Sequence, residues 1–292
     1  MNILTFDIEE WYIEKAFHGA RKEKFEIFDR YLAQILDILE ERGLNATFFC
    51  LGKMASDFPE IIKKIAGKGH EIACHSDKHV WLNKMSYKEV EEDTHIAIDS
   101  LEQLLGTKIK GYRAPAFSIG ENNKWAFEIF YKYGIEYDAS IFPAARDFGG
   151  FPSFGHNRPV MLSYQGIEIK EFPICMTRLL GKDIAYSGGG YFRLFPLWYV
   201  LKTINNSDYV MTYFHIGDLL PGSNKVMSRE DYETYFKEKG SIFNRYKRFV
   251  KSNLGRNNAF EKMSELITHT KMINIDQAIH EIQWERTVKV FL

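Results

Sequence analysis

The feature that most constrains the fold of this chain is the alternation, in its first half, of short apolar segments with longer segments of helical periodicity. Five segments are expected to be strands: 3–6, 46–50, 70–74, 109–112 and 135–137. Between them, residues 28–39 carry apolar side chains at i, i+3, i+4 spacing, and Ser86 with Glu89 forms a capping-box pattern that opens another helix. This order is typical of βα units around a parallel sheet, so we expect an α/β fold.

The rest of the chain is less regular. After Phe142 the sequence becomes aromatic and rich in turn residues, and strand character returns at 209–214. Residues 229–292 are charged and helical in pattern, and no linker or repeat separates them from what precedes. We therefore expect a single domain over 1–292, with a barrel of about 1–220 and a helical C-terminal extension of about 225–292.

Five polar residues each follow or end a different expected strand: Asp7, His75, Arg113, Asp138 and His215. Any one of them is more simply a helix cap or a local backbone partner. In a parallel barrel, however, the carboxyl ends of the strands share one rim, and active sites of α/β barrels lie there. Taken together, the five residues predict a functional site.

Two neighbouring pairs suggest metal chemistry at that rim. His75 and His79 are four residues apart and could face one ion, although such a pair alone is a weak signal. Asp7 and Glu9 are two apart, so along a strand they project to the same face. Two imidazoles and one carboxylate, with an open position for water, are the ligand set of a catalytic zinc, and the second carboxylate would be free as a general base.

Composition limits the partners and the compartment. The net charge of −1 and pI of about 6.8 give no whole-chain sign of nucleic-acid or anionic membrane binding. Cys50, Cys74 and Cys175 lack paired spacing, and the start of the sequence does not resemble a signal peptide, so we expect a cytoplasmic protein. No segment is apolar enough for a transmembrane helix, so membrane association would be peripheral or through the substrate.

Five motifs occur in the order and approximate spacing of the polysaccharide deacetylase family, carbohydrate esterase family four, also called NodB homology. They are Phe6-Asp7-Ile8-Glu9, His75-Ser76-Asp77-Lys78-His79, Arg113-Ala114-Pro115-Ala116-Phe117, Asp138-Ala139-Ser140-Ile141-Phe142-Pro143 and Tyr213-Phe214-His215. The resemblance covers about 1–220. Two further segments, 188–193 and 213–218, resemble the branch of this family linked to exopolysaccharide and surface-polysaccharide biosynthesis.

The resemblance implies a distorted or incomplete (β/α) barrel with its site at the C-terminal ends of the strands. It makes Asp7 the general base, oriented by Arg113, and His75 and His79 metal ligands. It makes His215 the general acid, supported by Asp138.

Many members carry two adjacent aspartates in the first motif, whereas this chain has Asp7-Ile8-Glu9. The strand alternation favours Glu9 as the carboxylate ligand, and Glu10 is the alternative. By the resemblance, the oxyanion donor would be a backbone N–H near Ala116 or Phe117.

Other residues are weaker candidates for substrate contact. We expect Pro115, Phe117, Trp11 and Tyr191 to line the substrate cleft, although aromatic residues more often fill a core. Asp147 and Asp218 could hold sugar hydroxyls, but each is more simply a loop residue. A phosphate-bearing carrier could be held by Arg146, Arg158, Arg178 and Arg193, for which surface solubility is the simpler explanation.

The resulting hypothesis is a metal-dependent hydrolase that removes the acetyl group from an N-acetylated sugar in polysaccharide or O-antigen biosynthesis. The sugar would be a nucleotide-linked or lipid-linked precursor. The metal would be Zn²⁺, with Co²⁺ or Ni²⁺ as substitutes. The alternatives are a metal-independent amide hydrolase resembling the allantoinase branch, and an inactive carbohydrate-binding barrel.

Overall fold

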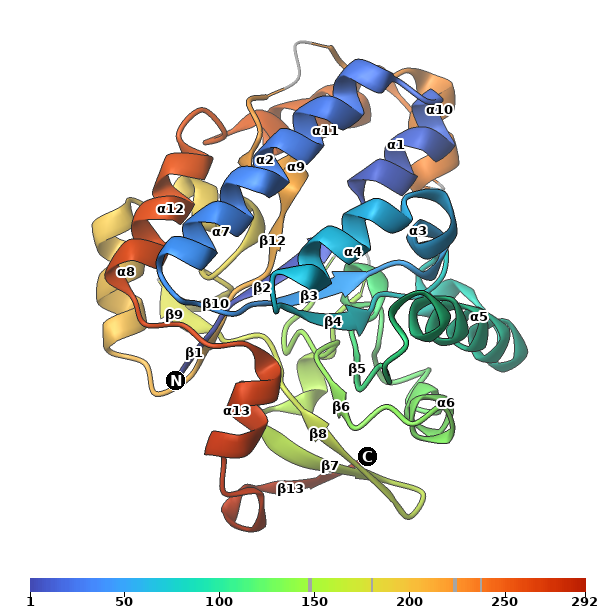
Figure 1. Cartoon of the computed structure of the whole chain (residues 1–292), viewed down its shortest axis with the longest axis vertical. Coiled ribbons are helices and arrows are strands. Elements are labelled where there is room, and N and C mark those ends of the chain that lie inside the picture. Colours follow the sequence, from blue (N-terminus) through green and yellow to red (C-terminus); the bar gives the residue numbers. More distant parts are fainter. Residues whose placement is uncertain (147–148, 180, 223–224, 237) are drawn as a thin grey trace.

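A nine-stranded sheet forms the centre of the computed structural model, which describes residues 1–146, 149–179, 181–222, 225–236 and 238–292 (Figure 1). All neighbouring strands are parallel except the antiparallel pair β7 and β8. In spatial order the strands are β12 (Phe214–His215), β2 (Thr5–Ile8), β3 (Thr47–Cys50), β4 (Glu71–Cys74), β5 (Gly111–Tyr112), β6 (Tyr137–Asp138), β8 (Ile167–Glu171), β7 (Val160–Tyr164) and β13 (Lys289–Phe291). The α/β prediction is confirmed, and the sheet does not close into a complete barrel within the described residues.

Helices follow the strands as βα units require. In α2 (Lys22–Glu41) the buried side chains form a single stripe: Phe28, Leu32, Ile35, Leu36 and Leu39. Helix α5 (Tyr87–Leu105) begins at Ser86, whose capping box with Glu89 is present, and ends at Gly106 in the left-handed conformation. The other helices of this half are α1 (Glu10–His18), α3 (Gly52–Asp57), α4 (Pro59–Gly67) and α6 (Ala126–Lys132).

The strand register brings the polar strand-end residues to one edge of the sheet. His215 lies opposite Asp7, and Ile8 lies opposite Cys50, which lies opposite Cys74. The residues that follow β4 and β5, His75 and Arg113, therefore leave the sheet at the same level as Glu9, which follows β2.

The second half of the chain is built into the same structure. Strand β1 (Asn2–Ile3) pairs with β11 (Val210–Met211), and β9 (Thr177–Leu179) pairs with β10 (Lys182–Ile184). In α13 (Ile275–Glu281), Ile275 N–H donates to Thr47 Oγ1 at 2.8 Å and Asp276 N–H donates to Glu71 Oε2 at 3.1 Å.

The end of the chain differs from the helical extension expected for 225–292. It is helical in α10 (Arg229–Phe236), α11 (Ile242–Asn253), α12 (Ala259–His269) and α13. It then ends in β13, which pairs in parallel with β7 at the edge of the main sheet. A strand of three residues is too short to show an alternating pattern in the sequence. Its pairing with β7 stabilises it, and that pairing depends on the tertiary structure.

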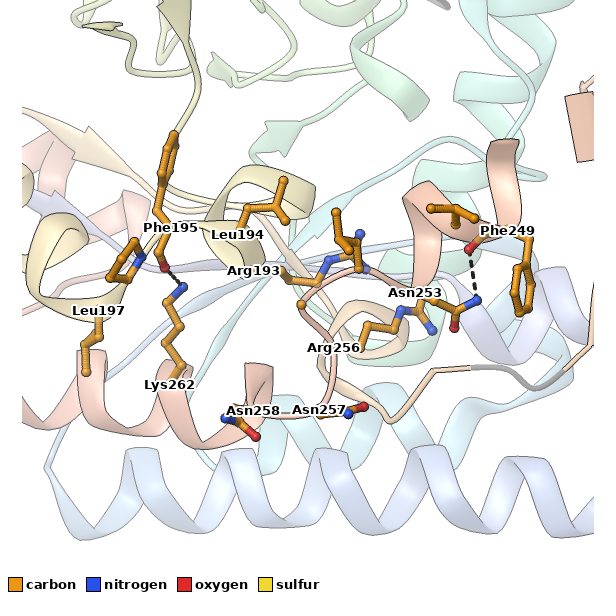
Figure 2. A pocket seen from close by; sticks show the side chains of 14 residues that line it. Arg193, Leu194, Phe195, Leu197, Phe249, Asn253, Arg256, Asn257, Asn258 and Lys262 are labelled. Carbon is orange, nitrogen blue, oxygen red and sulfur yellow. Dashed lines mark hydrogen bonds between the residues drawn. The ribbon is translucent and has the colours of Figure 1, made fainter. Parts of the chain in front are cut away.

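Two segments from this half enclose a hollow of about 580 Å³ (Figure 2). One is the turn between α7 (Gly189–Leu194) and α8 (Leu197–Asn205), and the other runs from the end of α11 to the start of α12. Within the described parts of the chain, no helix has the length and apolar character needed to cross a membrane.

Close packing between α3 and α5 gives a stability prediction. An added Cβ on Gly52 would lie 2.4 Å from Ala97 Cα and 2.9 Å from Ala97 Cβ, both in the rigid middle of α5. We expect Gly52→Ala to lower the free energy of unfolding by about 1–3 kcal/mol. Gly67→Ala is the control, because an added Cβ there meets no atom within 4 Å. Equilibrium urea unfolding that shows equal effects for both variants would contradict this packing.

Candidate active site and metal centre

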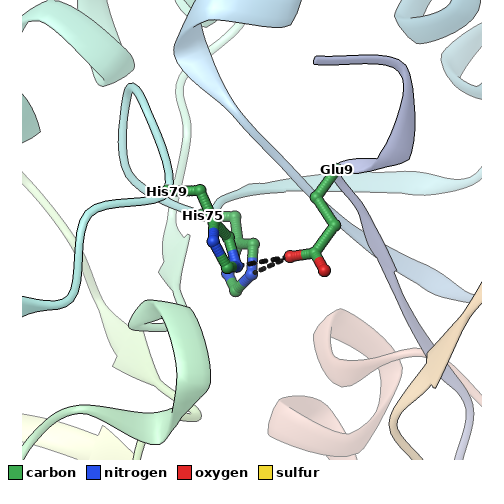
Figure 3. Close-up of side chains that lie close together, drawn as sticks. All are labelled: Glu9, His75 and His79. Atoms are coloured by element: carbon green, nitrogen blue, oxygen red, sulfur yellow. Dashed lines mark ion pairs between the residues drawn. The ribbon is translucent and has the colours of Figure 1, made fainter. Parts of the chain in front are cut away.

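Glu9, His75 and His79 come together at the edge of the sheet (Figure 3). Glu9 Oε2 lies 3.3 Å from His75 Nε2 and 2.5 Å from His79 Nε2. The side chains are largely buried, with exposed fractions of 12% or less. This is the one group of three or more His, Cys, Asp or Glu side chains in the described residues whose ligand atoms could share an ion.

The chemistry of these donors fits a divalent metal. His75 Nδ1 lies 2.7 Å from the carbonyl oxygen of Arg113, which can only accept, so Nδ1 carries the proton. His75 Nε2, the ring nitrogen that this contact leaves for another partner, faces Glu9. Glu9 Oε2 is buried and has no hydrogen-bond partner of normal geometry among the described residues. Two imidazole nitrogens and one carboxylate that face one another are a zinc-type donor set.

Electrostatics keep the carboxylate of Glu9 in its charged form. Burial alone would raise its pKa, but the charges of His79 and His215 outweigh burial and hold the pKa well below its usual value. Glu9 is therefore ionised at neutral pH, the form of a carboxylate that can bind a metal ion.

Arg113 and Asp7 form the pair expected from the sequence. Arg113 is fully buried, and its Nη1 donates to Asp7 Oδ1 at 2.7 Å. Burial would raise the pKa of Asp7, but Arg113, with His75 and His215, outweighs it and holds the pKa below its ordinary value. Asp7 is thus ionised and able to accept a proton.

His215 completes the site from the other half of the chain. Its Nε2 lies 3.5 Å from Asp7 Oδ2 and 3.8 Å from Glu9 Oε1, and 27% of its side chain is exposed. Burial would lower its pKa, but the hydrogen bond with Asp218 and the charges of Glu9 and Asp7 raise the pKa to about 10. His215 is therefore protonated at neutral pH and can give up a proton.

The partner of His215 differs from the expected one. Asp218 Oδ2 lies 3.2 Å from His215 Nδ1, whereas Asp138 accepts hydrogen bonds from the backbone N–H and the hydroxyl of Ser140. Asp138 pairs in register with Tyr112, the residue before Arg113. Because successive strand residues point to opposite faces, Asp138 turns away from the face that carries Asp7 and Arg113. The expectation that Asp138 supports His215 is therefore wrong.

The sequence predicted Asp218 to be a loop residue, whereas the structure pairs it with His215. It lies in α9 (Ile216–Leu219), three residues after His215, so one helical turn brings it under the imidazole. Its other oxygen accepts from Arg193 Nη1 at 2.7 Å. The sequence did contain a signal for this pairing, because Asp218 is a carboxylate about one helical turn after the candidate catalytic His215. Asp147, the other residue expected to hold hydroxyls, lies outside the described residues.

Glu10, the alternative carboxylate ligand, has a different place. Its Oε1 accepts from Gly217 N–H at 2.6 Å and so ties α1 to α9. Burial, with the neighbouring charge of Glu9, raises the pKa of Glu10 to about 7. The structure thus brings Glu9, and not Glu10, to the two histidines.

Strained backbone also gathers at this site. Among the described residues, four of the five non-glycine residues with positive φ lie in its two loops: Ser76, His79, Ala116 and Phe117. Such conformations persist only where the surroundings enforce them, and they cluster at functional sites. Phe117 N–H donates to Ala114 O at 3.0 Å, which leaves the N–H of Ala116 as the candidate oxyanion donor.

The residues expected to line the cleft are mostly core residues. Trp11 is 1% exposed and packs against Phe28, so the expectation that it contacts substrate is wrong. Trp11 lies at the start of α1, where its ring is buried. Pro115 and Phe117 are also buried, whereas Tyr191 in α7 is 45% exposed.

The four arginines expected near a phosphate have different surroundings. Arg193 is held by Asp218, and Arg158 lies 3.0 Å from the exposed carboxylate of Asp208. Arg146 lies over the ring of Phe142, at 4.5 Å from its centroid. Arg178 lies in β9.

Comparison with known proteins identifies two family models along the chain. Residues 3–137 match the polysaccharide deacetylase model, and residues 139–280 match a domain of unknown function, DUF3473. The fold is similar to that of a Mycobacterium smegmatis protein described as a polysaccharide deacetylase, with a TM-score of 0.60 and 18% identity over 100% of this chain and 92% of that one.

Curated relatives match shorter segments. A peptidoglycan-N-acetylglucosamine deacetylase from Bacillus cereus is 38% identical over 99 residues, which are 34% of this chain and 36% of that protein. A chitooligosaccharide deacetylase from Sinorhizobium fredii is 36% identical over 61 residues, which are 21% of this chain and 28% of that protein. The chain thus spans about a third of the length of these curated relatives.

The donor geometry gives a prediction about metal binding. We expect Glu9→Gln to weaken zinc affinity by about 100-fold or more, because a neutral amide replaces a charged ligand and even outer-shell changes cost 10–100-fold. Glu10→Gln is the matched control and should stay within a few-fold, since its carboxylate binds Gly217 N–H. Isothermal titration with zinc measures both, and an equal loss in Glu10→Gln would contradict the assignment.

Proposed function

We propose that this chain, whose residues 3–137 belong to the polysaccharide deacetylase family, is a metal-dependent hydrolase that removes the acetyl group from an N-acetylated sugar. One observation carries the proposal: an ionised carboxylate, Asp7, and a protonated imidazole, His215, face each other across 3.5 Å beside the Glu9, His75 and His79 group. A base, an acid and a metal-type donor set in one site are what amide hydrolysis requires.

The residues divide the chemistry as follows. Asp7 takes a proton from the attacking water, and Arg113 keeps Asp7 ionised and oriented. His215 gives its Nε2 proton to the departing amine, which leaves poorly as an anion, while Asp218 holds Nδ1. The backbone N–H of Ala116 donates to the oxyanion. A divalent ion, Zn²⁺ by preference or Co²⁺ or Ni²⁺, would be held by Glu9, His75 and His79 and supplies Lewis acidity toward the water and the acetyl carbonyl.

The proposed substrate class is supported by the named activities of the relatives and by two segments of the sequence, 188–193 and 213–218. The named relatives act on peptidoglycan N-acetylglucosamine and on chitooligosaccharide. For this chain we place the reaction in exopolysaccharide, surface-polysaccharide or O-antigen biosynthesis, because 188–193 and 213–218 resemble that branch. The substrate would be a nucleotide-linked or lipid-linked acetamido sugar.

We propose a cytoplasmic site of action, which agrees with the state of the three cysteine thiols. Cys50, Cys74 and Cys175 are all buried and unpaired, as suits a reducing compartment.

The two matched segments form one functional unit in this proposal. Asp7, Glu9, His75, His79 and Arg113 come from the first segment, whereas His215 and Asp218 come from the second. A site that draws its base from one segment and its acid from the other needs both, so we treat 1–292 as a single domain.

Comparative assay of acetate release tests the function. The zinc-loaded protein should release acetate from acetylated nucleotide sugars or lipid-linked sugars in preference to chitin oligomers. Asp7→Asn should lose about 10²–10⁴-fold, the usual range for removing a general base. Fast release from long polymer alone would overturn the precursor assignment, and no release from any of the three substrates would overturn the activity.

The dependence of activity on pH distinguishes Asp218 from Asp138. Asp218 raises the pKa of His215, so Asp218→Asn lowers it. Because His215 acts as an acid only while protonated, activity falls as pH rises through this pKa, and the alkaline limb should move to lower pH by about 1 unit or more. Asp138→Asn should leave the limb where it is. A shift in Asp138→Asn alone would refute the pairing of His215 with Asp218.

A further inference from the structure

Helix α11 carries its apolar side chains outward. Five large apolar residues on one side of this segment are between 46% and 75% exposed: Ile242, Phe243, Tyr246, Val250 and Leu254. The spacing of 242, 246, 250 and 254 gives a continuous stripe. No residue of α11 is buried.

Two arginines of α11, Arg245 and Arg248, face the protein instead. Arg245 Nη1 donates to Met227 O at 3.2 Å, and Arg248 Nη2 lies 3.7 Å from Glu238 Oε1. Arg248 also lies over the ring of Phe236, at 4.2 Å from its centroid. This orientation is the reverse of an ordinary surface helix, whose apolar stripe faces the core.

The surroundings of the stripe are strongly cationic. Residues 239–258 contain six Lys and Arg residues and no Asp or Glu, in a chain with a net charge of −1. Lys247 and Lys251 are exposed and lie next to the stripe along the helix. Residues 239–258 are thus enriched in positive charge around the exposed apolar stripe.

The hollow in Figure 2 lies beside this helix and continues the same face. Its far wall is the segment 193–197 between α7 and α8, in which Leu194 is 50% exposed. Tyr191 in α7 and Trp198 in α8 flank this segment and are 45% and 66% exposed. Arg193, Arg256 and Lys262 line it. Arg193 Nε and Arg256 Nε are buried donors without hydrogen-bond partners among the described residues, so they remain for an anionic group, whereas Asn253 Oδ1, also buried and unpartnered there, is an acceptor.

We propose that this face, made of the α11 stripe, the α7–α8 turn and the hollow between them, docks on an anionic lipid bilayer. The apolar side chains would enter the boundary between headgroups and acyl chains, and the hollow would receive a lipid phosphate group. Outward apolar residues flanked by Lys and Arg are the pattern of interfacial helices. A second copy of the chain is a poor occupant, because it would bring two cationic faces together. The proposal goes beyond the deacetylase function and does not depend on it.

One side chain connects this face to the active site. Arg193 Nη1 donates both to Asp218 Oδ1 at 2.7 Å and to Ser252 O at 3.1 Å, at the end of α11. Asp218 in turn holds His215. Docking would therefore place the site close to the bilayer surface, where the sugar of a lipid-linked substrate lies.

Vesicle flotation of the zinc-loaded full chain tests the proposal. The protein should float with phosphatidylcholine vesicles that contain about 30% phosphatidylglycerol, and not with pure phosphatidylcholine, and high salt should weaken binding. Phe243→Ser combined with Tyr246→Ser should reduce partitioning by about tenfold or more, through lost apolar burial. Lys247→Gln combined with Lys251→Gln should reduce it by about tenfold or more, through lost charge. Arg256→Gln should weaken binding to the anionic vesicles as well.

Phe291→Ser is the matched control. Phe291 is 74% exposed, as Phe243 is 72% exposed, but it lies in β13 at the other end of the molecule (Figure 1). It should leave flotation unchanged, and thermal unfolding checks that every variant is folded. Two results would overturn the proposal: no flotation of the parent protein with the anionic vesicles, or unchanged flotation in both double variants. A dimer that Phe243→Ser disrupts, without flotation, would assign this face to a second copy of the chain.

Discussion

The buried guanidinium of Arg113 is the interaction on which the site depends. It donates to Asp7 and Thr5 in β2, to the carbonyl of Ala139 after β6, and it lies 4.0 Å from the centroid of the Phe49 ring in β3. Its own carbonyl oxygen fixes the proton of His75 on Nδ1. A buried charge without partners is costly, so these contacts must form together. The same residue thereby favours the ionised form of Asp7 and orients the ring of His75.

Sequence reasoning succeeded where local pattern and topology agree. Strand periodicity and the rule that parallel strands end at one rim predicted the gathering of Asp7, His75, Arg113 and His215. The period of two along β2 also predicted which glutamate faces the histidines. The prediction for Asp138 was wrong, although the same period of two determines which face Asp138 points to. That face depends on the register of β6 against β5, which is set by tertiary pairing and cannot be read from the motif. Asp218 and β13 were missed for a related reason. Asp218 is held by Arg193, which is distant in the sequence, and β13 is a short strand that pairs with the distant β7.

The arrangement also explains why two family models meet in one structure. The first ends at 137 and the second begins at 139, in the middle of β6. The boundary between sequence families thus falls inside a strand of the central sheet, and strands on both sides of it pair with one another. The two matched segments therefore share one sheet, and neither segment pairs all of its strand edges without the other.

Whole-chain averages conceal the most distinctive surface of the molecule. A net charge of −1 gives no sign of affinity for an anionic membrane, yet residues 239–258 carry six cations and no acidic side chain. The apolar residues at 242, 246, 250 and 254 are spaced four apart, but this spacing does not say whether they face the core or the solvent. The contacts of Arg245 and Arg248 decide this, because they hold the side of α11 that carries these two arginines against the protein. Ordinary surface helices are anchored by apolar burial, whereas α11 is anchored by charge and hydrogen bonding, and this leaves its apolar residues available to a partner.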